Sequence, residues 1–146
     1  MRTVLPRAIP ALVLGSVLAA LAAGCTAQGA PAASPDEPAH VEEIEGSELK
    51  LVRLTPEAAG RLGIATTESV AEGTRIVVPY GAIFYDPKGA AWVYVEGAPL
   101  EYVRQEVSVD AIEGDLARLT EGPEAGSSVV STGVAELYGT EFEVGH

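Results

Sequence analysis

The stretch LEYVRQEVSVD, residues 100–110, alternates apolar and polar side chains along most of its length. Because successive side chains of a β-strand point to opposite faces, this alternation predicts a long strand with one buried face and one face in water. The buried face would hold Val103, Gln105, Val107 and Val109, and the wet face would hold Arg104, Glu106 and Ser108.

Shorter apolar runs separated by turn residues continue this pattern on both sides, from residue 75 onward. DPKG (86–89) has the proline and glycine placement of a type I turn, and EGD (113–115) and EGPEAG (121–126) indicate two further turns. We therefore expect a mainly β domain over residues 49–146, a small antiparallel roll or barrel-like sheet with one or two short helices. The predicted strands are 76–78, 82–85, 92–95, 116–120, 128–132 and 139–144, the last with Phe142 and Val144 facing inward.

A short helix is predicted just before this β region. Thr55 suits the N-cap, Pro56 the first helical position, and Glu57 the positive end of the helix dipole. Gly63 is typical of the residue that follows a helix. The helix would then make about two turns before Gly63 and pack through Leu54 and Leu62.

Residues 1–24 have the organisation of an export signal. Arg2 and Arg7 form a short basic region, and the apolar stretch at 11–20 is too short for a comfortable membrane span. The signal ends in Leu21-Ala22-Ala23-Gly24-Cys25, which resembles the lipobox of bacterial lipoproteins.

The lipobox resemblance implies cleavage before Cys25, whose thiol would carry a diacylglycerol thioether, and whose freed amine would accept a further acyl chain such as palmitate. Two or three acyl chains anchor a protein stably, so we expect the chain on the extracytoplasmic face of the cell membrane. Two alternatives remain open. An ordinary signal peptidase could cut after ALA (20–22) and leave Cys25 as a spare thiol, or the segment could stay uncut as a short anchor.

Residues 25–48 are rich in Ala, Pro, Gly and acid and hold almost no large apolar side chain. Such a segment cannot bury enough surface to offset its ordering entropy, so it predicts a flexible tether. The run Glu42, Glu43, Glu45 and Glu48 could suggest a metal site, but a solvated acidic linker explains it as well.

The charge balance narrows the choice of partners. Without Arg2 and Arg7, seven basic residues face 21 acidic ones, which gives the mature chain a net charge of −14. A surface of this sign repels phosphate backbones and anionic lipid headgroups. Nucleic acid is therefore excluded as a partner, and attachment to a membrane has to come from the lipid anchor.

The residues offer little to catalysis. His40 lies in the tether and His146 at the end of the sequence, so neither is placed as a base for a serine nucleophile. Asp110, Glu113 and Asp115 cluster in a turn without a calcium-loop spacing. We expect no enzyme, no cofactor and no metal site.

Several blocks of the β region together resemble the membrane-proximal domain of periplasmic adaptor subunits, also called membrane-fusion proteins, of the HlyD/AcrA type. Their order and spacing carry the resemblance more than any one motif. LTPEAA (54–59), followed by Leu62, Gly63, Ile64 and Thr67, is similar to the lead-in of adaptors in heavy-metal efflux systems. The other blocks are VPYGAI (78–83), WVYV (92–95), VRQEV (103–107), LTEG (119–122) and VVSTGVAEL (129–137).

The resemblance implies a subunit that docks on an integral membrane transporter, of the RND or ABC type, in efflux. The family's long helical hairpin, lipoyl-like domain and β-barrel are missing here, because Glu72-Gly73 leads straight into the second block. A complete pump adaptor is therefore excluded, and an accessory subunit is expected. The alternative is a free-standing lipoprotein that binds a ligand or a cell-wall fragment.

Overall fold

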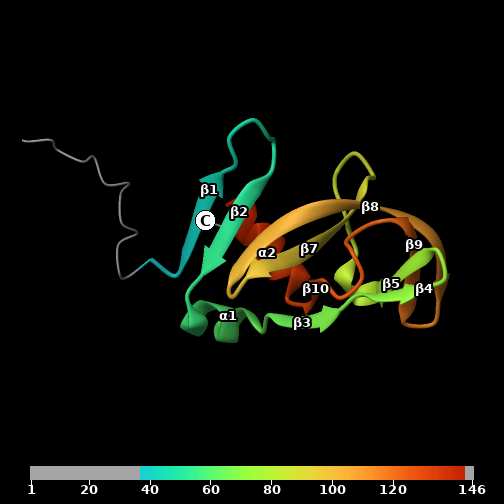
Figure 1. The fold of residues 1–146 in the computed structure, drawn as a ribbon. Helices are drawn as coiled ribbons and strands as arrows, with labels where there is room; N and C mark the ends of the chain where they lie inside the picture. The colour runs from blue at the N-terminus through green and yellow to red at the C-terminus, as the bar shows by residue number, and fades with distance from the viewer. Residues whose placement is uncertain (1–36, 144–146) are drawn as a thin grey trace, which may run out of the picture. The chain divides into compact units, whose positions relative to one another are not determined.

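The computed structural model describes residues 37–143, which lie within one compact unit. Ten of its elements are antiparallel strands of one sheet, so the predicted mainly β fold is confirmed. Figure 1 labels most of these elements. In chain order they are β1 (Ala39–Glu43), β2 (Lys50–Leu54), α1 (Pro56–Leu62), β3 (Ala65–Glu68), β4 (Val70–Glu72), β5 (Arg75–Pro79), η1 (Tyr80–Ala82), β6 (Phe84–Tyr85), β7 (Ala91–Ala98), β8 (Glu101–Glu113), β9 (Leu116–Glu121), β10 (Ser128–Thr132) and α2 (Val134–Glu141).

The sheet curls into a nearly closed barrel. Its strands follow the order β3-β10-β7-β8-β9-β5-β4, and β3 and β4 are consecutive in the chain, so the chain itself joins the two ends of this path. Strands β2 and β1 continue the sheet outside the barrel, with β2 paired to β8 and β1 paired to β2. The barrel wall therefore has a two-stranded extension.

Ser69 forms the corner between β3 and β4. Its backbone N–H donates to the Ser127 carbonyl at 2.8 Å, and its own carbonyl accepts from the Gly126 N–H at 2.7 Å. Its hydroxyl donates to the Glu124 carbonyl at 2.7 Å and accepts from the Ser127 N–H at 3.1 Å. These four bonds satisfy the buried serine and hold the barrel seam to the loop before β10.

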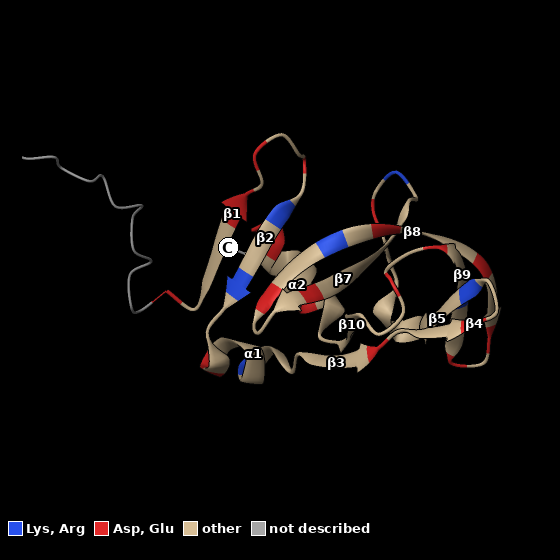
Figure 2. Ribbon diagram, in the orientation of Figure 1, with Lys and Arg blue, Asp and Glu red and all other residues tan. Residues whose placement is uncertain are grey.

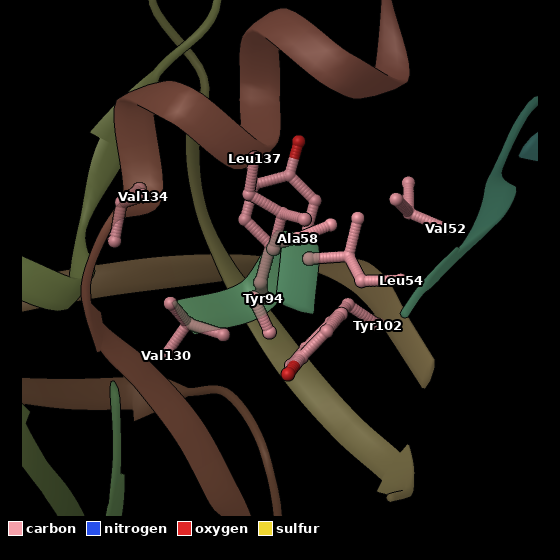
Figure 3. Close-up of a cluster of buried hydrophobic side chains, with 9 residues drawn as sticks. Val52, Leu54, Ala58, Tyr94, Tyr102, Val130, Val134 and Leu137 are labelled. Atoms are coloured by element: carbon pink, nitrogen blue, oxygen red, sulfur yellow. The ribbon is translucent and has the colours of Figure 1, made fainter. Parts of the chain in front are cut away.

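The strands at the centre of the sheet bury both faces. Val93 and Tyr94 are neighbours in β7 and are both 0% exposed, so they serve two different cores. The first core lies inside the barrel and includes Val93, Val107 and Val129. The second lies on the outside of the same wall. Figure 3 shows Tyr94 there against Leu137 of α2, and Val130 belongs to the same cluster.

One face of residues 100–110 was predicted to lie in water. This prediction is wrong for the first half of the strand. Tyr102 is 2% exposed and belongs to the second core, and the Arg104 side chain on the same face is only 12% exposed. This face is covered because β2 pairs alongside β8, with Val52 opposite Tyr102, while α2 packs on β2. On the predicted dry face, Gln105 is exposed.

The short helix α1 begins and ends where the sequence predicted. The Thr55 hydroxyl accepts a hydrogen bond from the Ala58 N–H at 3.1 Å, and Pro56 occupies the first helical position. Gly63 follows the helix in the left-handed conformation, with φ of 65°. The inward-facing Ala58 and Ala59 of the helix join the second core.

Two predicted segments are corrected. The tether does not extend to residue 48, because residues 39–43 form β1, whose Ala39 and Val41 pack against the second core. Residues 139–141 continue the helix α2 instead of starting a strand, because Val134, Leu137 and Glu141 form one buried helical face. Phe142 is the C-cap and is 38% exposed, and Val144 lies outside the described residues. Strands β3 and β4 were not predicted.

Replacing Gly133, the N-cap of α2, is expected to destabilise the fold strongly. Gly133 has a φ of 80°, and a Cβ there would lie 2.6 Å from Ile64 Cδ1 and 3.0 Å from the Leu62 carbonyl oxygen. Gly89→Ala is the matched control, since Gly89 has a φ of 86° with nothing within 4 Å of a built Cβ. In urea unfolding, Gly89→Ala should cost about 1–2 kcal/mol, and Gly133→Ala about 1–3 kcal/mol more. Equal losses would contradict the close packing of α2 on the end of α1.

Candidate binding groove

The residues of the predicted lipidation site, Cys25 with Leu21, Ala22, Ala23 and Gly24, lie outside the described residues, as does His146. His40 lies in β1, where its Nε2 is 3.4 Å from a Glu42 carboxylate oxygen. The other features that the sequence singled out can be placed.

A groove of about 860 Å³ runs between the start of β1 and the exposed face of α2. Its α2 side is formed by Ala135, Glu136, Gly139 and Thr140, which recur at helical spacing. A smaller hollow of about 340 Å³ adjoins it beneath Leu54, Ala58 and Arg61 and shares Pro38, Ala39, Leu62 and Thr140 with it. We call the larger of the two the β1–α2 groove.

A buried carboxylate holds α2 in the position that forms this groove. Glu141, in the last turn of α2, is 0% exposed. The Tyr94 hydroxyl of β7 donates to Glu141 Oε2 at 2.5 Å, and the Arg104 Nε of β8 lies 3.0 Å from Glu141 Oε1. Arg104 Nε and Glu141 Oε1 are not aligned as a hydrogen bond, so their attraction is mainly Coulombic.

Burial, reinforced by the hydrogen bond to Glu141, raises the pKa of Tyr94 far above its ordinary value. The hydroxyl therefore keeps its proton at any physiological pH and remains a donor to the carboxylate. The charge of Arg104 partly opposes this shift in the pKa of Tyr94. Together the three side chains tie one end of α2 to the hairpin of β7 and β8.

Aromatic rings enclose the Arg104 guanidinium. Its central carbon lies 4.5 Å from the Trp92 ring centroid and 5.1 Å from that of Phe142. Phe142 contacts Tyr138 at 4.6 Å between centroids, and Tyr138 contacts Phe84 at 5.4 Å. Cation–π attraction of this kind is stronger where water is excluded, so the rings add to the attachment of α2.

The rim of the groove is acidic. Glu37, Glu136 and Glu143 line it, and each is exposed. Acidic residues also outnumber basic ones along the whole described ribbon (Figure 2). On the opposite side of β1, Glu42 is already paired, because Arg53 lies 2.8 Å from it and 2.8 Å from Glu101. The carboxylates of the groove rim have no such ion pair among residues 37–143.

Two acidic residues of the turn considered as a calcium site, Asp110 and Glu113, form ion pairs at the surface. Asp110 lies 2.8 Å from Arg75, and Glu113 lies 2.5 Å from Arg118, which also contacts Glu72. These contacts raise the pKa of Arg118, first through its hydrogen bond to Glu72. Across residues 37–143, no three His, Cys, Asp or Glu side chains gather as a metal site would require.

The sequence did not identify Glu141 or the groove. Glu141 was interpreted as an outward residue of a strand, although its spacing from Val134 and Leu137 is helical. Among the tyrosines of the described residues, Tyr94 and Tyr102 are buried. Tyr80 and Tyr85 are 42% and 53% exposed.

No protein-family model, curated protein or solved structure matches the chain. Neither helix within residues 37–143 has the length and hydrophobicity needed to cross a bilayer.

Glu141→Gln tests whether the buried carboxylate holds α2. The variant keeps the shape and an acceptor for Tyr94 but leaves Arg104 without its negative partner, so it should lower the free energy of unfolding by about 3 kcal/mol. Glu136→Gln on the exposed side of the same helix should change it by less than about 0.5 kcal/mol. Denaturant unfolding of both variants checks this. Similar stabilities for the two would show that Glu141 contributes no special anchor.

Proposed function

We propose that the chain is a lipid-anchored accessory subunit that docks on an integral membrane transporter and catalyses nothing itself. Efflux is the proposed direction, on the resemblance to the adaptor family. The observation that carries the docking role is the β1–α2 groove, which lies beside a strand whose only pairing within residues 37–143 is to β2. A groove next to an available strand edge is a common way for one protein to take up a segment of another.

The proposed lipid anchor and the domain would work together. Residues 25–38 separate Cys25 from β1. A link of this length would keep the domain within a few tens of ångströms of the bilayer. A tether raises the effective concentration of the domain at a membrane-bound partner, so even weak contacts in the groove would be sufficient for docking.

The rigid attachment of α2 also supports docking. A helix tied down by Glu141, Tyr94 and Arg104 keeps one wall of the groove in place before any partner binds. A preformed surface loses less entropy on association than a mobile one. These three residues hold the groove wall in position and need not touch the partner themselves.

The alternative, a free-standing lipoprotein that binds a ligand or a cell-wall fragment, draws on one observation. The groove volume of about 860 Å³ lies within the usual range for small-molecule sites. Against it stands the exposure of the flanking residues Glu37, Pro38, Ala135 and Glu136, since small-molecule sites bury most of their ligand.

Purification from native membranes separates the two functions. We expect the full chain, extracted from its host in mild detergent, to bring down one integral membrane protein in a fixed ratio. Mass spectrometry of the same preparation should find the chain without residues 1–24 and with acyl chains on Cys25.

The variant that tests the groove is Glu136→Arg, which changes only the charge of the groove rim. A deletion of residues 134–143 would remove the groove wall formed by α2, but it is unsuitable because it would also unfold the second core.

Glu136→Arg should lower recovery of the membrane protein while leaving the amount of anchored chain unchanged. Recovery of the chain alone, under conditions that preserve known membrane complexes of the same host, would contradict the accessory role. A bare Cys25 thiol would contradict the anchor.

A further inference from the structure

The unpaired edge of β1 presents a definite set of backbone groups. The Thr55 N–H bonds the Pro38 carbonyl at 3.0 Å, and the Ile44 N–H bonds the Leu49 carbonyl at 3.2 Å. Hydrogen-bonded pairs alternate along an antiparallel ladder, so with the register of β1 and β2 the groups of His40 and Glu42 point toward β2. The N–H and C=O groups of Ala39, Val41 and Glu43 therefore point to the outer edge.

The groove lies on the face of β1 that carries the side chains of the same residues. Ala39 and Val41 face the second core and also line the groove, together with Leu62 and Ala135. A strand added along β1 would therefore direct every second side chain toward these apolar groups. The polar backbone edge and the apolar wall thus suit an extended chain better than a compact ligand.

The acidic residues around the groove indicate the charge of the segment that would bind there. Glu37, Glu136 and Glu143 line the groove, Glu43 ends the edge strand, and all four are exposed. Residues 25–36 of this chain contain Asp36 and neither Lys nor Arg, so like charge disfavours them as the occupant. A second copy of this strongly acidic chain is disfavoured for the same reason.

We infer that the outer edge of β1 and the β1–α2 groove bind an extended, positively charged segment of a partner protein by adding it as a strand. This inference rests on the proposed docking function in taking that partner to be the transporter. The side chains of the segment that face the groove are apolar beside Val41 and Leu62 and are Lys or Arg at the two ends, where they meet the acidic rim. Three outward backbone positions set the register, and the carboxylates set the sign of charge.

Synthetic peptides test the edge and the charge together. The full chain, purified in detergent, is titrated with the eight-residue peptide Lys-Thr-Val-Thr-Val-Thr-Lys-Thr, whose Lys and Val side chains share one face of a strand, and, as the matched control, with the same peptide carrying Glu at both Lys positions. We expect the Lys peptide alone to bind, to slow hydrogen exchange at the amides of Ala39, Val41 and Glu43, and to bind more weakly as salt is raised.

Two variants separate backbone pairing from side-chain contact. Val41→Pro removes an N–H that points outward, so the pairing with β2 is kept and binding should fall about tenfold. Val41→Ala shortens the same side chain but retains the N–H, so its loss should be clearly smaller. Glu136→Gln combined with Glu143→Gln, which leaves β1 unchanged, should weaken binding several-fold and reduce its dependence on salt.

Equal binding of the two peptides, protection of amides elsewhere than on β1, or no binding of the Lys peptide would overturn the inference. Protection of Ala39, Val41 and Glu43 that grows with protein concentration alone would also overturn it, because a second copy would then be the occupant. If the peptides fail while the chain still recovers its membrane protein, docking stands and takes place elsewhere. If the Lys peptide binds but no membrane protein is recovered, the groove is a peptide-binding site and the proposed docking on a transporter is wrong.

Discussion

The Glu141 carboxylate is the contact on which the arrangement of the second core and of the groove depends. The helix α2 has only eight residues and no side-chain N-cap, so it would not persist without tertiary contacts. A fully buried acid is unfavourable unless it is paired, and here Tyr94 and Arg104 supply a hydrogen bond and a positive charge from adjacent strands. The pair fixes both the position and the rotation of the helix, because an apolar contact alone would tolerate some sliding.

The barrel gives this anchor a rigid base. Tyr94 and Arg104 are directly opposite each other in the register of β7 and β8, and the reverse side of these strands is packed inside the barrel. Movement of either strand would disturb both cores. The fold therefore places its best-supported strands beneath α2, and α2 in turn forms one wall of the groove, while the second wall is the edge strand β1.

The sequence predicted those parts that local rules determine. Thr55, Pro56 and Gly63 located α1 within a residue, and the turn at Asp86–Gly89 closes with a bond from the Gly89 N–H to the Asp86 carbonyl at 2.9 Å. Features that depend on distant packing were missed. Ala39 and Val41 look like linker residues until β2 pairs with them, and Arg104 was placed on the wet face although its side chain is largely covered. Glu141 was placed on an exposed face because its burial depends on Tyr94 and Arg104, which are far from it in the sequence. The groove is lined by residues 37–41, Leu62 and residues of 135–143, which are far apart in the sequence, so no local pattern predicts it.

The proposed anchor, acidic surface and groove form one account of the molecule. Its negative charge opposes contact with anionic headgroups and phosphate. The carboxylates of the groove rim have no ion pair among residues 37–143, so they favour a positively charged protein segment there. Photocrosslinking in the native host tests this most directly, with a photoreactive amino acid placed at position 136 on the rim or at the exposed position 88 in the turn before β7. The account predicts a crosslink from position 136 to a basic segment of an integral membrane protein and none from position 88. Crosslinks of equal yield from both positions, or none from position 136, would contradict it.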